Sequence, residues 1–314
     1  MMEKIPVVSI VGPTASGKTA LAVAVALALN GEVISADSMQ IYRRMDIATA
    51  KPEPQELMGV PHHLLDFLEP TESFSVARFC ELAKAAIEDI HSRGKLPIIA
   101  GGTGLYVDSL LGDTRFEEQE DDPELRAQIV AEIEEKGIDA MLEHIRTFDP
   151  ESADRLSIGR NPKRIARCIE VYRSTGMTQT QLNKKQKQES SPYRAVKIGL
   201  TADREYLYER IDRRVDIMME KGLLEEARRF YESESGDTAA AAIGYKELLP
   251  YLSGEKELSE CVDDLKRATR RYAKRQLTWF RRDPEIRWFR IDEADPGQLS
   301  EDVIDFIKKE SAYG

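Results

Sequence analysis

Apolar residues along the chain form short continuous runs that alternate with longer stretches of helical spacing. The runs at Ile5–Val11, Val33–Ser35 and Leu96–Ala100 predict buried strands, because strands covered on both faces carry few polar positions. Helical spacing predicts a helix over Lys18–Leu29, and Ser75 is placed to cap another over 76–93. This alternation favours an α/β fold in which a parallel sheet carries helices on both faces.

The pattern changes near Phe116 and returns near Ser191. The segment between them is highly charged, helical in spacing and poor in strand signals. After it, apolar runs predict strands over 195–200 and 286–291, and helical spacing predicts helices over 203–221, 259–282 and 298–309. We therefore predict an all-helical domain over 117–191, inserted into an α/β core formed by 1–116 together with 192–314.

Composition limits the class of protein and the cellular compartment that we expect. The chain has 314 residues, 41% hydrophobic and 32% charged, which suits a globular protein of about two domains. No apolar run approaches the roughly 20 residues that span a bilayer, so no membrane partner is expected. Cys80, Cys168 and Cys261 lie far apart and offer neither a disulfide framework nor a zinc site. We expect a cytoplasmic protein and, by default, a monomer.

Charge is distributed unevenly along the chain, whose formal net charge is −11. Segment 117–154 holds 14 acidic residues against 3 basic ones. Segments 155–194 and 266–290 each hold 10 Lys or Arg residues against 2 acidic ones, a local net charge of +8. Pairing with acidic neighbours is one explanation of each basic cluster. The aromatic residues Tyr272, Trp279 and Phe280 within the second cluster favour the other explanation, a polyanion partner such as a nucleic acid.

The most specific motif lies between the first predicted strand and the first predicted helix. It is a complete G-x-x-x-x-G-K-[ST] sequence, Gly12-Pro13-Thr14-Ala15-Ser16-Gly17-Lys18-Thr19. Backbone N–H groups of such a loop cradle phosphate oxygens, and the helix N-terminus adds partial positive charge. Lys18 is expected to reach the terminal phosphate, and the Thr19 hydroxyl to bind Mg²⁺. The motif predicts a P-loop, NTPase-like core that binds a di- or triphosphate.

A carboxylate is expected opposite this loop. Asp37 directly follows the second predicted strand, and Thr103 follows the third within Gly101–Gly104, where many P-loop NTPases carry a Mg²⁺-binding Asp instead. Ligands of open α/β sheets lie at the carboxyl ends of the strands, so both side chains should face the P-loop. Alternatively, Asp37 only caps the Ser38-Met39-Gln40 turn.

A phosphate site with a facing carboxylate suits two reactions. The carboxylate can activate a hydroxyl that attacks a γ-phosphoryl group, as in a small-molecule kinase, or it can accept a proton from a nucleophile that attacks carbon while diphosphate leaves. Arg210 and Arg214 lie four residues apart on one face of a predicted helix and are candidates to clamp the diphosphate. Helix arginines are more often solvated, which is the alternative here.

Seven motifs, in order from about residue 6 to 290, resemble those of the tRNA dimethylallyltransferase (tRNA isopentenyltransferase) family. They are the P-loop 12–19, Asp37-Ser38-Met39-Gln40-Ile41-Tyr42, Asp46-Ile47-Ala48-Thr49-Ala50-Lys51-Pro52, Pro61-His62-His63-Leu64-Leu65-Asp66, Gly101-Gly102-Thr103-Gly104-Leu105-Tyr106, Ile243-Gly244-Tyr245-Lys246-Glu247 and Lys274-Arg275-Gln276-Leu277-Thr278-Trp279-Phe280-Arg281. The chain lacks the C-terminal zinc finger of the usual eukaryotic members, so it resembles the bacterial form.

The resemblance implies transfer of a dimethylallyl group from dimethylallyl diphosphate to N6 of the adenosine 3′-adjacent to the anticodon of tRNA, with release of diphosphate. By motif, Asp37 is the general base for the N6 proton, and Thr103 hydrogen-bonds the oxygen that bridges the allyl carbon and the diphosphate. Lys18, the loop amides, Arg210 and Arg214 hold the diphosphate, with Mg²⁺ near Thr19. A P-loop small-molecule kinase remains the alternative, but it leaves both basic segments without a role.

The resemblance also implies contacts with the anticodon stem-loop, whose target adenosine must leave the base stack to reach a pocket. The implied tRNA contacts are Asp37, Ser38, Met39, Gln40, Thr103, Arg126, Asn161, Pro162, Lys163, Arg164, Ile165, Ala242, Ile243, Gly244, Tyr245, Lys246, Glu247, Lys274, Arg275, Gln276, Leu277, Thr278, Trp279, Phe280 and Arg281.

Overall fold

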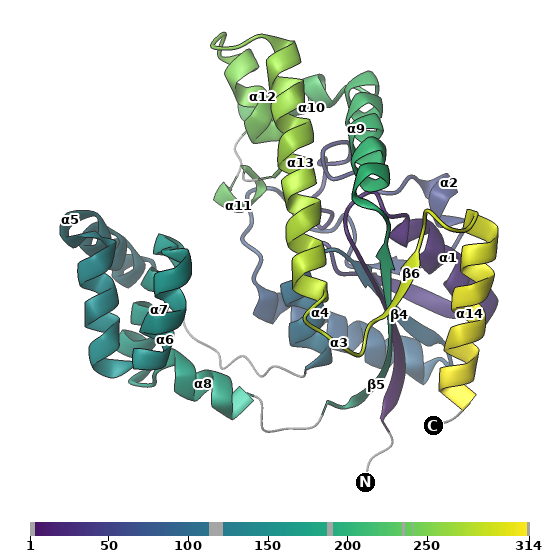
Figure 1. The fold of residues 1–314 in the computed structure, drawn as a ribbon, viewed down its shortest axis with the longest axis horizontal. Helices are drawn as coiled ribbons and strands as arrows, with labels where there is room; N and C mark the ends of the chain where they lie inside the picture. Colours follow the sequence, from purple (N-terminus) through teal and green to yellow (C-terminus); the bar gives the residue numbers. More distant parts are fainter. Residues whose placement is uncertain (1–3, 113–121, 187–190, 234–235, 241, 313–314) are drawn as a thin grey trace. The chain divides into compact units, whose positions relative to one another are not determined.

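Six parallel strands form one sheet in the order β3-β2-β4-β1-β5-β6 within the residues that the structure, a computed structural model, describes (4–112, 122–186, 191–233, 236–240 and 242–312; Figure 1). The strands are β1 (Ile5–Val11), β2 (Gly31–Ser35), β3 (His62–His63), β4 (Leu96–Gly101), β5 (Tyr193–Thr201) and β6 (Arg287–Arg290). The predicted parallel α/β sheet is confirmed.

The chain divides into two compact units, Met1–Leu111 with Pro192–Gly314, and Gly112–Ser191. The predicted domain boundary at residue 116 lies outside the described residues. Helices of the first unit are α1 (Lys18–Leu29), α2 (Pro54–Leu57), α3 (Val76–Ser92), α4 (Gly104–Leu111), α9 (Arg204–Glu220), α10 (Leu223–Glu232), α11 (Asp237–Ala240), α12 (Tyr245–Leu252), α13 (Leu258–Phe280) and α14 (Pro296–Ala312). Helices of the second unit are α5 (Pro123–Phe148), α6 (Pro150–Gly159), α7 (Pro162–Thr175) and α8 (Gln179–Gln186).

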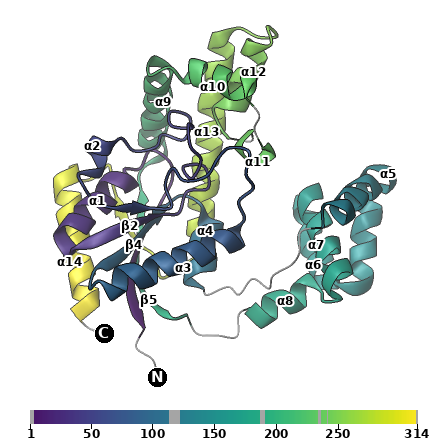
Figure 2. The same cartoon turned by 180° about the vertical axis from the view of Figure 1, so that it is seen from behind.

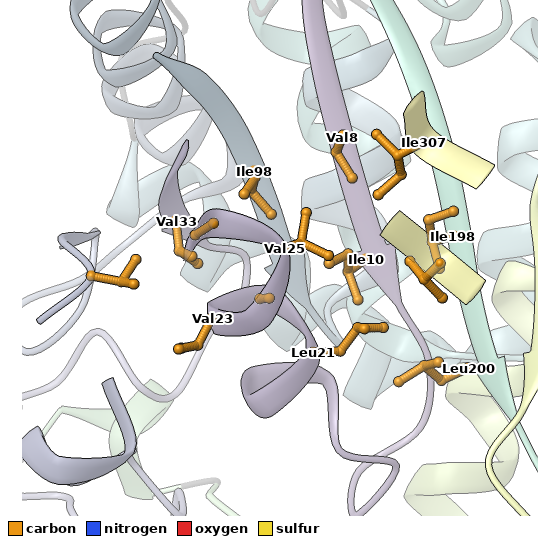
Figure 3. Close-up of a cluster of buried hydrophobic side chains, with 14 of the residues drawn as sticks. Val8, Ile10, Leu21, Val23, Val25, Val33, Ile98, Ile198, Leu200 and Ile307 are labelled. Carbon is orange, nitrogen blue, oxygen red and sulfur yellow. The ribbon is translucent and has the colours of Figure 1, made fainter. Parts of the chain in front are cut away.

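Helices cover both faces of the sheet (Figures 1 and 2). On one face, apolar side chains of β1, β2, β4 and β5 pack against α1 and α14 in a buried cluster (Figure 3). Side chains of a strand alternate between faces, so neighbours such as Ile34 and Ile99 point to the other face, where α3 packs on β2 and β4. Burial on both faces explains why these strands are continuous apolar runs.

A further layer of helices stands beyond the carboxyl ends of the strands. Helices α9, α10, α12 and α13 pack together there and share a core with Ile41, Tyr42 and Met45 (Figure 1). This layer is part of the first unit and faces the P-loop edge of the sheet. The short helices α2, α4 and α10–α12 were not predicted from the sequence, because helices this short show no long apolar period.

The second unit is helical throughout its described residues. Its core is built from α5, α6 and α7, with residues such as Ile129, Ile145 and Ile169 buried, and α5 is interrupted at Gly137, whose φ is 79°. Basic side chains of segment 155–194 pair with the acidic segment before them, including Arg173 with Glu132 at 2.7 Å. Ion pairs with acidic neighbours therefore explain the charge at Arg160, Arg167, Arg173 and Lys184.

Of the two helix caps predicted from the sequence, Ser75 and Asp203, only the first forms the expected hydrogen bond. Ser75 caps α3, and its hydroxyl accepts a hydrogen bond from Arg78 N at 3.2 Å, as the sequence predicts. Asp203 occupies the position before α9, but its side chain makes no cap hydrogen bond. Its carboxylate instead pairs with Arg290 at 3.0 Å, an interaction across 87 residues of sequence that no local pattern indicates.

We expect Gly101→Ala to destabilise the first unit by about 2–5 kcal/mol, the range typical of severe core substitutions. A Cβ at this position would overlap the carbonyl oxygen of Ala36, which is backbone and cannot move aside. The measurement is urea unfolding followed by tryptophan fluorescence, since Trp279 and Trp288 both lie in the first unit. Gly297→Ala is the control in the same unit, because Gly297 is exposed and a Cβ there would meet only the Asp295 carboxylate, and an equal loss of stability in both variants would contradict the prediction.

Candidate active site

The P-loop leaves β1 and enters α1 through three residues of positive φ. They are Gly12 at 150°, Ala15 at 63° and Gly17 at 86°. A Cβ on Gly12 would press on the backbone of Leu200, so the loop also needs glycine there for space. The Ser16 hydroxyl and the Lys18 ammonium both donate to the carbonyl oxygen of Pro13, at 2.8 and 2.7 Å, which closes the loop on itself.

The charge of Lys18 is poorly compensated. Desolvation of its ammonium group lowers its pKa to about 8, although Asp37 acts in the opposite direction, and Arg214 lowers it further. Desolvation also lowers the pKa of the Arg214 guanidinium. The negative charges of Asp37 and Glu56 raise this pKa, and repulsion from Arg210 lowers it further. Three cations thus surround a space with a facing carboxylate, which is the electrostatic environment of an anion site.

Asp37 stands at the carboxyl end of β2, and its orientation is fixed by a tight turn. Its Oδ1 accepts hydrogen bonds from the backbone N–H groups of Met39 at 2.9 Å and Gln40 at 3.4 Å. These are the bonds expected of a helix cap, but no helix follows them. The turn therefore holds the carboxylate in place where it lines the cavity described below.

Thr103 is joined to the same turn. Its backbone N–H donates to Ala36 O at 3.1 Å, and its hydroxyl accepts from Ser38 N at 3.0 Å and donates to Ser38 Oγ at 3.2 Å. Ser38 lines the cavity, whereas Thr103 is not part of the lining that the described residues form. The structure thus brings Asp37 and Thr103 to one edge of the sheet, as predicted, with Ser38 between Thr103 and the open space.

A cavity of about 900 Å³ lies at this edge, within the first unit. Polar walls come from the P-loop residues Thr14, Ala15, Gly17, Lys18 and Thr19, from 37–40, and from Arg210, Arg213 and Arg214 of α9. Apolar walls come from Ile47, Ala48, Ile211, Val215, Ile243 and Leu265. One cavity therefore offers an anion cradle and an apolar compartment side by side.

The arginines of α9 reach this cavity, as their spacing predicts. The Arg210 Nε donates to the carbonyl oxygen of Ala15 in the P-loop at 2.8 Å. Arg214 Nη2 lies 3.5 Å from the carbonyl oxygen of Ala50, on the opposite wall. Arg210 is exposed and Arg214 is of intermediate exposure, so partial solvation also describes their position, and their role as a diphosphate clamp stays a prediction.

Glu226 on α10 is a site residue that the sequence reasoning missed. Its buried carboxylate accepts hydrogen bonds from the backbone N–H groups of Asp46, Ile47 and Ala48, at 2.8–3.0 Å, and from the Tyr245 hydroxyl at 2.9 Å. It thereby holds the loop that forms one cavity wall. An acidic residue in an amphipathic helix is normally solvated, so nothing in the sequence pattern could single it out.

Basic residues on α13 form a stripe along one helix face, which we call the α13 stripe. Its members are all exposed: Arg271, Lys274 and Arg275 at spacings of three and four on the helix, and Arg281 and Arg282 directly after its last residue. None of them makes an ion pair with the described residues, whereas Lys266 pairs with Asp216 at 2.6 Å and Arg270 with Asp212 at 2.6 Å. Arg275 also lines the cavity, so the stripe runs to its edge.

Other predicted tRNA contacts are divided between surface and core. Ala242, Ile243 and Lys246 line the cavity, while Tyr245, Phe280 and Gln276 are buried and Leu277 packs against the sheet core. The Trp279 indole donates to Asp108 at 2.7 Å, Thr278 is exposed, and Glu247 accepts from Gly244 N at 2.9 Å.

The remaining predicted contacts belong to the second unit. Asn161 caps α7, accepting from the backbone N–H groups of Lys163 and Arg164, and Pro162 opens the helix. Ile165 is fully buried, and Arg126 pairs with Glu170 at 3.0 Å. These contacts are all with other residues of that unit, and the role of these residues in binding tRNA stays a prediction.

The parallel sheet, the P-loop at its carboxyl edge and the facing carboxylate define a P-loop α/β protein. A model of the IPP transferase family matches residues 40–283. The chain therefore belongs to the IPP transferase family.

Individual relatives extend this match over nearly the full length. The tRNA dimethylallyltransferase of Bacillus subtilis is 49% identical over 287 residues, 91% of each chain, and that of Acetivibrio thermocellus is 47% identical over 291 residues, 92% of this chain and 93% of the relative. The crystal structure of the Bacillus halodurans tRNA isopentenylpyrophosphate transferase is 43% identical, with a TM-score of 0.74 and 99% coverage of both chains. A eukaryotic dimethylallyltransferase acting on tRNA is 30% identical, with a TM-score of 0.81 and coverage of 97% of this chain and 80% of that one.

The described residues contain neither a metal-ligand cluster nor a membrane-spanning helix. No three His, Cys, Asp or Glu side chains among them group so that they could hold a metal ion. Within the same ranges, no helix is long and apolar enough to cross a membrane. Cys80, Cys168 and Cys261 are all buried, and no disulfide joins them.

We expect the affinity of this cavity for inorganic diphosphate to fall as the pH rises through about 8, because Lys18 then loses its charge. Since one proton is involved, the loss approaches about tenfold per pH unit above the pKa of the free protein. Calorimetric titrations between pH 7 and 9.5 measure this. Lys18→Arg stays charged and serves as the control for titration of diphosphate itself, so an identical pH dependence in both proteins would contradict the prediction.

Proposed function

We propose that the protein transfers a dimethylallyl group from dimethylallyl diphosphate to N6 of the adenosine 3′-adjacent to the anticodon of tRNA. The observation that carries this proposal is a single cavity in which the P-loop, two arginines and the Asp37 carboxylate meet beside an apolar wall. Relatives of nearly the same length are named tRNA dimethylallyltransferases, which supports this activity over a small-molecule kinase.

In the proposed reaction, the N6 nitrogen of adenine attacks the terminal allyl carbon of the donor. A new C–N bond forms as the C–O bond to diphosphate breaks, and the leaving diphosphate takes the bonding electron pair. Asp37 accepts the proton that N6 releases, which suits a weakly nucleophilic exocyclic amine. Thr103 is the donor proposed for the bridging oxygen of the diphosphate, which requires its hydroxyl to turn away from Ser38 Oγ, its acceptor in the structure.

Diphosphate would be held by the P-loop amides, Lys18, Arg210 and Arg214. These groups stabilise negative charge as it develops on the leaving group, which is where preorganised cations lower a barrier most. Mg²⁺ fits beside Thr19, which lines the cavity, because Mg²⁺ keeps several waters and is commonly bound by substrate phosphates with few protein ligands. When bound there, it would neutralise part of the diphosphate charge.

RNA would dock on the α13 stripe, with further contacts from the turn at 161–165 and Arg126 in the second unit. The stripe carries cations that make no ion pair with the described residues, and Arg275 brings it to the cavity, so a phosphate backbone lying on it would bring a flipped adenine toward Asp37. The apolar wall formed by Ile47, Ile211 and Leu265 suits the dimethylallyl tail.

One assay tests the proposed function. The protein is incubated with unmodified tRNA, Mg²⁺ and radiolabelled dimethylallyl diphosphate, without nucleoside triphosphate. Label recovered at N6 of the adenosine beside the anticodon supports the proposal. Absence of label, with ATP-dependent phosphorylation of a metabolite instead, would support the kinase.

We expect Asp37→Ala to lower the single-turnover rate about 10²- to 10⁴-fold, the usual contribution of a general base. Affinity for tRNA should stay within a few-fold, because the RNA contacts are spread over many residues. Rapid-quench kinetics and a filter-binding titration measure the two quantities. Lost tRNA binding with an unchanged chemical rate would be incompatible with Asp37 as the base.

Replacing Arg271 and Lys274 by Ala should weaken tRNA binding and flatten its dependence on salt. Each phosphate contact that is lost lowers the slope of log Kd against log salt by about 1. Filter binding over a series of KCl concentrations measures this slope. Arg267→Ala is the matched control, because Arg267 is paired with Asp264 on the same helix. A double variant with the wild-type slope would exclude the stripe as the docking surface.

A further inference from the structure

Gln276 is a buried polar residue on α13 that the proposed chemistry does not use. Its side chain is 5% exposed, although its neighbours Lys274 and Arg275 are exposed members of the α13 stripe. A buried amide must place its hydrogen-bonding atoms on protein partners, and the partners here belong to the active site. Gln276 is therefore the point where the basic helix meets the catalytic loops.

Both ends of this amide are occupied. Its Oε1 accepts a hydrogen bond from the backbone N–H of Thr14 in the P-loop at 2.8 Å. Its Nε2 donates to the carbonyl oxygen of Gly102 at 3.0 Å, in the peptide that precedes Thr103. One side chain on α13 thus bridges the loop that cradles phosphate and the loop that carries Thr103.

The surroundings of Gln276 leave it little freedom. A Cβ on Gly102 would overlap Nε2 of Gln276, so glycine at 102 is what lets the amide approach. Tyr272, one turn earlier on α13, lines the cavity, and burial raises the pKa of its phenol, while hydrogen bonding with Thr103 and Gln276 acts in the opposite direction. The inner face of α13 is therefore fitted against both loops, while the outer face presents cations to solvent.

We propose that Gln276 is a positioning residue that couples RNA docking on α13 to the geometry of the P-loop and of the Gly102–Thr103 peptide; this rests on the proposed function. A helix moves as a rigid segment, so a small displacement of α13 by a docked polyanion changes both hydrogen bonds of Gln276 together. Thr14 lines the cavity, so the change reaches the diphosphate cradle. Because coupling of binding is reciprocal, diphosphate and RNA should each strengthen binding of the other.

The test measures binding in the absence of transfer. Affinity for inorganic diphosphate with Mg²⁺ is determined by calorimetry, with and without a synthetic anticodon stem-loop RNA. In the wild type we expect the RNA to raise diphosphate affinity about fivefold or more. In Gln276→Met, which keeps the shape but neither hydrogen bond, the RNA should change diphosphate affinity less than about twofold, while RNA affinity without diphosphate stays near wild type.

A second variant approaches the same contact from the other side. Gly102→Ala leaves Gln276 unchanged but displaces its amide, so it should abolish the coupling as Gln276→Met does. Gln298→Met, an exposed glutamine on α14, is the matched control and should keep the wild-type coupling. In the transfer reaction at saturating donor, Gln276→Met should lower kcat about 10- to 100-fold and raise the KM for tRNA only by about the coupling factor that is lost, a split that a merely structural role would not produce.

Three results would overturn the proposal: no coupling in the wild type, coupling retained in either Gln276→Met or Gly102→Ala, or a loss of RNA affinity in Gln276→Met as large as its loss of coupling. The last result would make Gln276 a direct RNA contact. The failure of the proposed function is a separate result, namely no label transfer by the wild type, because the coupling is measured by binding alone.

Discussion

Parallel pairing of β1, β4 and β2 is the constraint on which the site depends. Ser35 of β2 lies opposite Ala100 of β4, and Val11 of β1 lies opposite Gly101, so the strands end at one edge of the sheet. The segment that follows each strand must turn there, and these turns contain the P-loop, Asp37 and Thr103. Because backbone pairing sets this register, the P-loop, Asp37 and Thr103 converge without any contact of their own having to bring them together.

Burial destabilises the charged forms of the cations at this edge by more than the neighbouring carboxylate stabilises them. Lys18 and Arg214 both have lowered pKa values, for which desolvation is the first cause, and Asp37 compensates only in part. An anion that enters the cavity relieves this imbalance, and the relief is largest when negative charge accumulates on it. The same arrangement explains why a P-loop can serve a reaction in which the whole diphosphate departs from carbon and no phosphoryl group is transferred.

Two buried polar side chains make the hydrogen bonds to loop backbone that regular secondary structure makes elsewhere. The loop at 46–52 has little regular structure, and Glu226 satisfies three of its backbone N–H groups from α10. Gln276 on α13 likewise hydrogen-bonds the backbone N–H of Thr14 and the carbonyl oxygen of Gly102. A buried carboxylate or amide is costly unless fully hydrogen-bonded, so each of these residues specifies one loop geometry strongly. Both helices that supply them also contribute to the core beyond the strand ends.

The sequence alone was sufficient for features whose interactions are local. The strand at Ile5–Val11, the helix at Lys18–Leu29 and the Ser75 cap depend on residues within a few positions of one another, and the ordered motifs were enough to suggest the family. Only the tertiary structure decided which charges pair and which stay free for a partner, as the contrast between Arg173 and Lys274 shows. It also decided that Gln276 serves the P-loop, through a hydrogen bond between residues 262 positions apart. No periodicity records such a contact, because burial of a polar side chain depends on what the folded chain places around it.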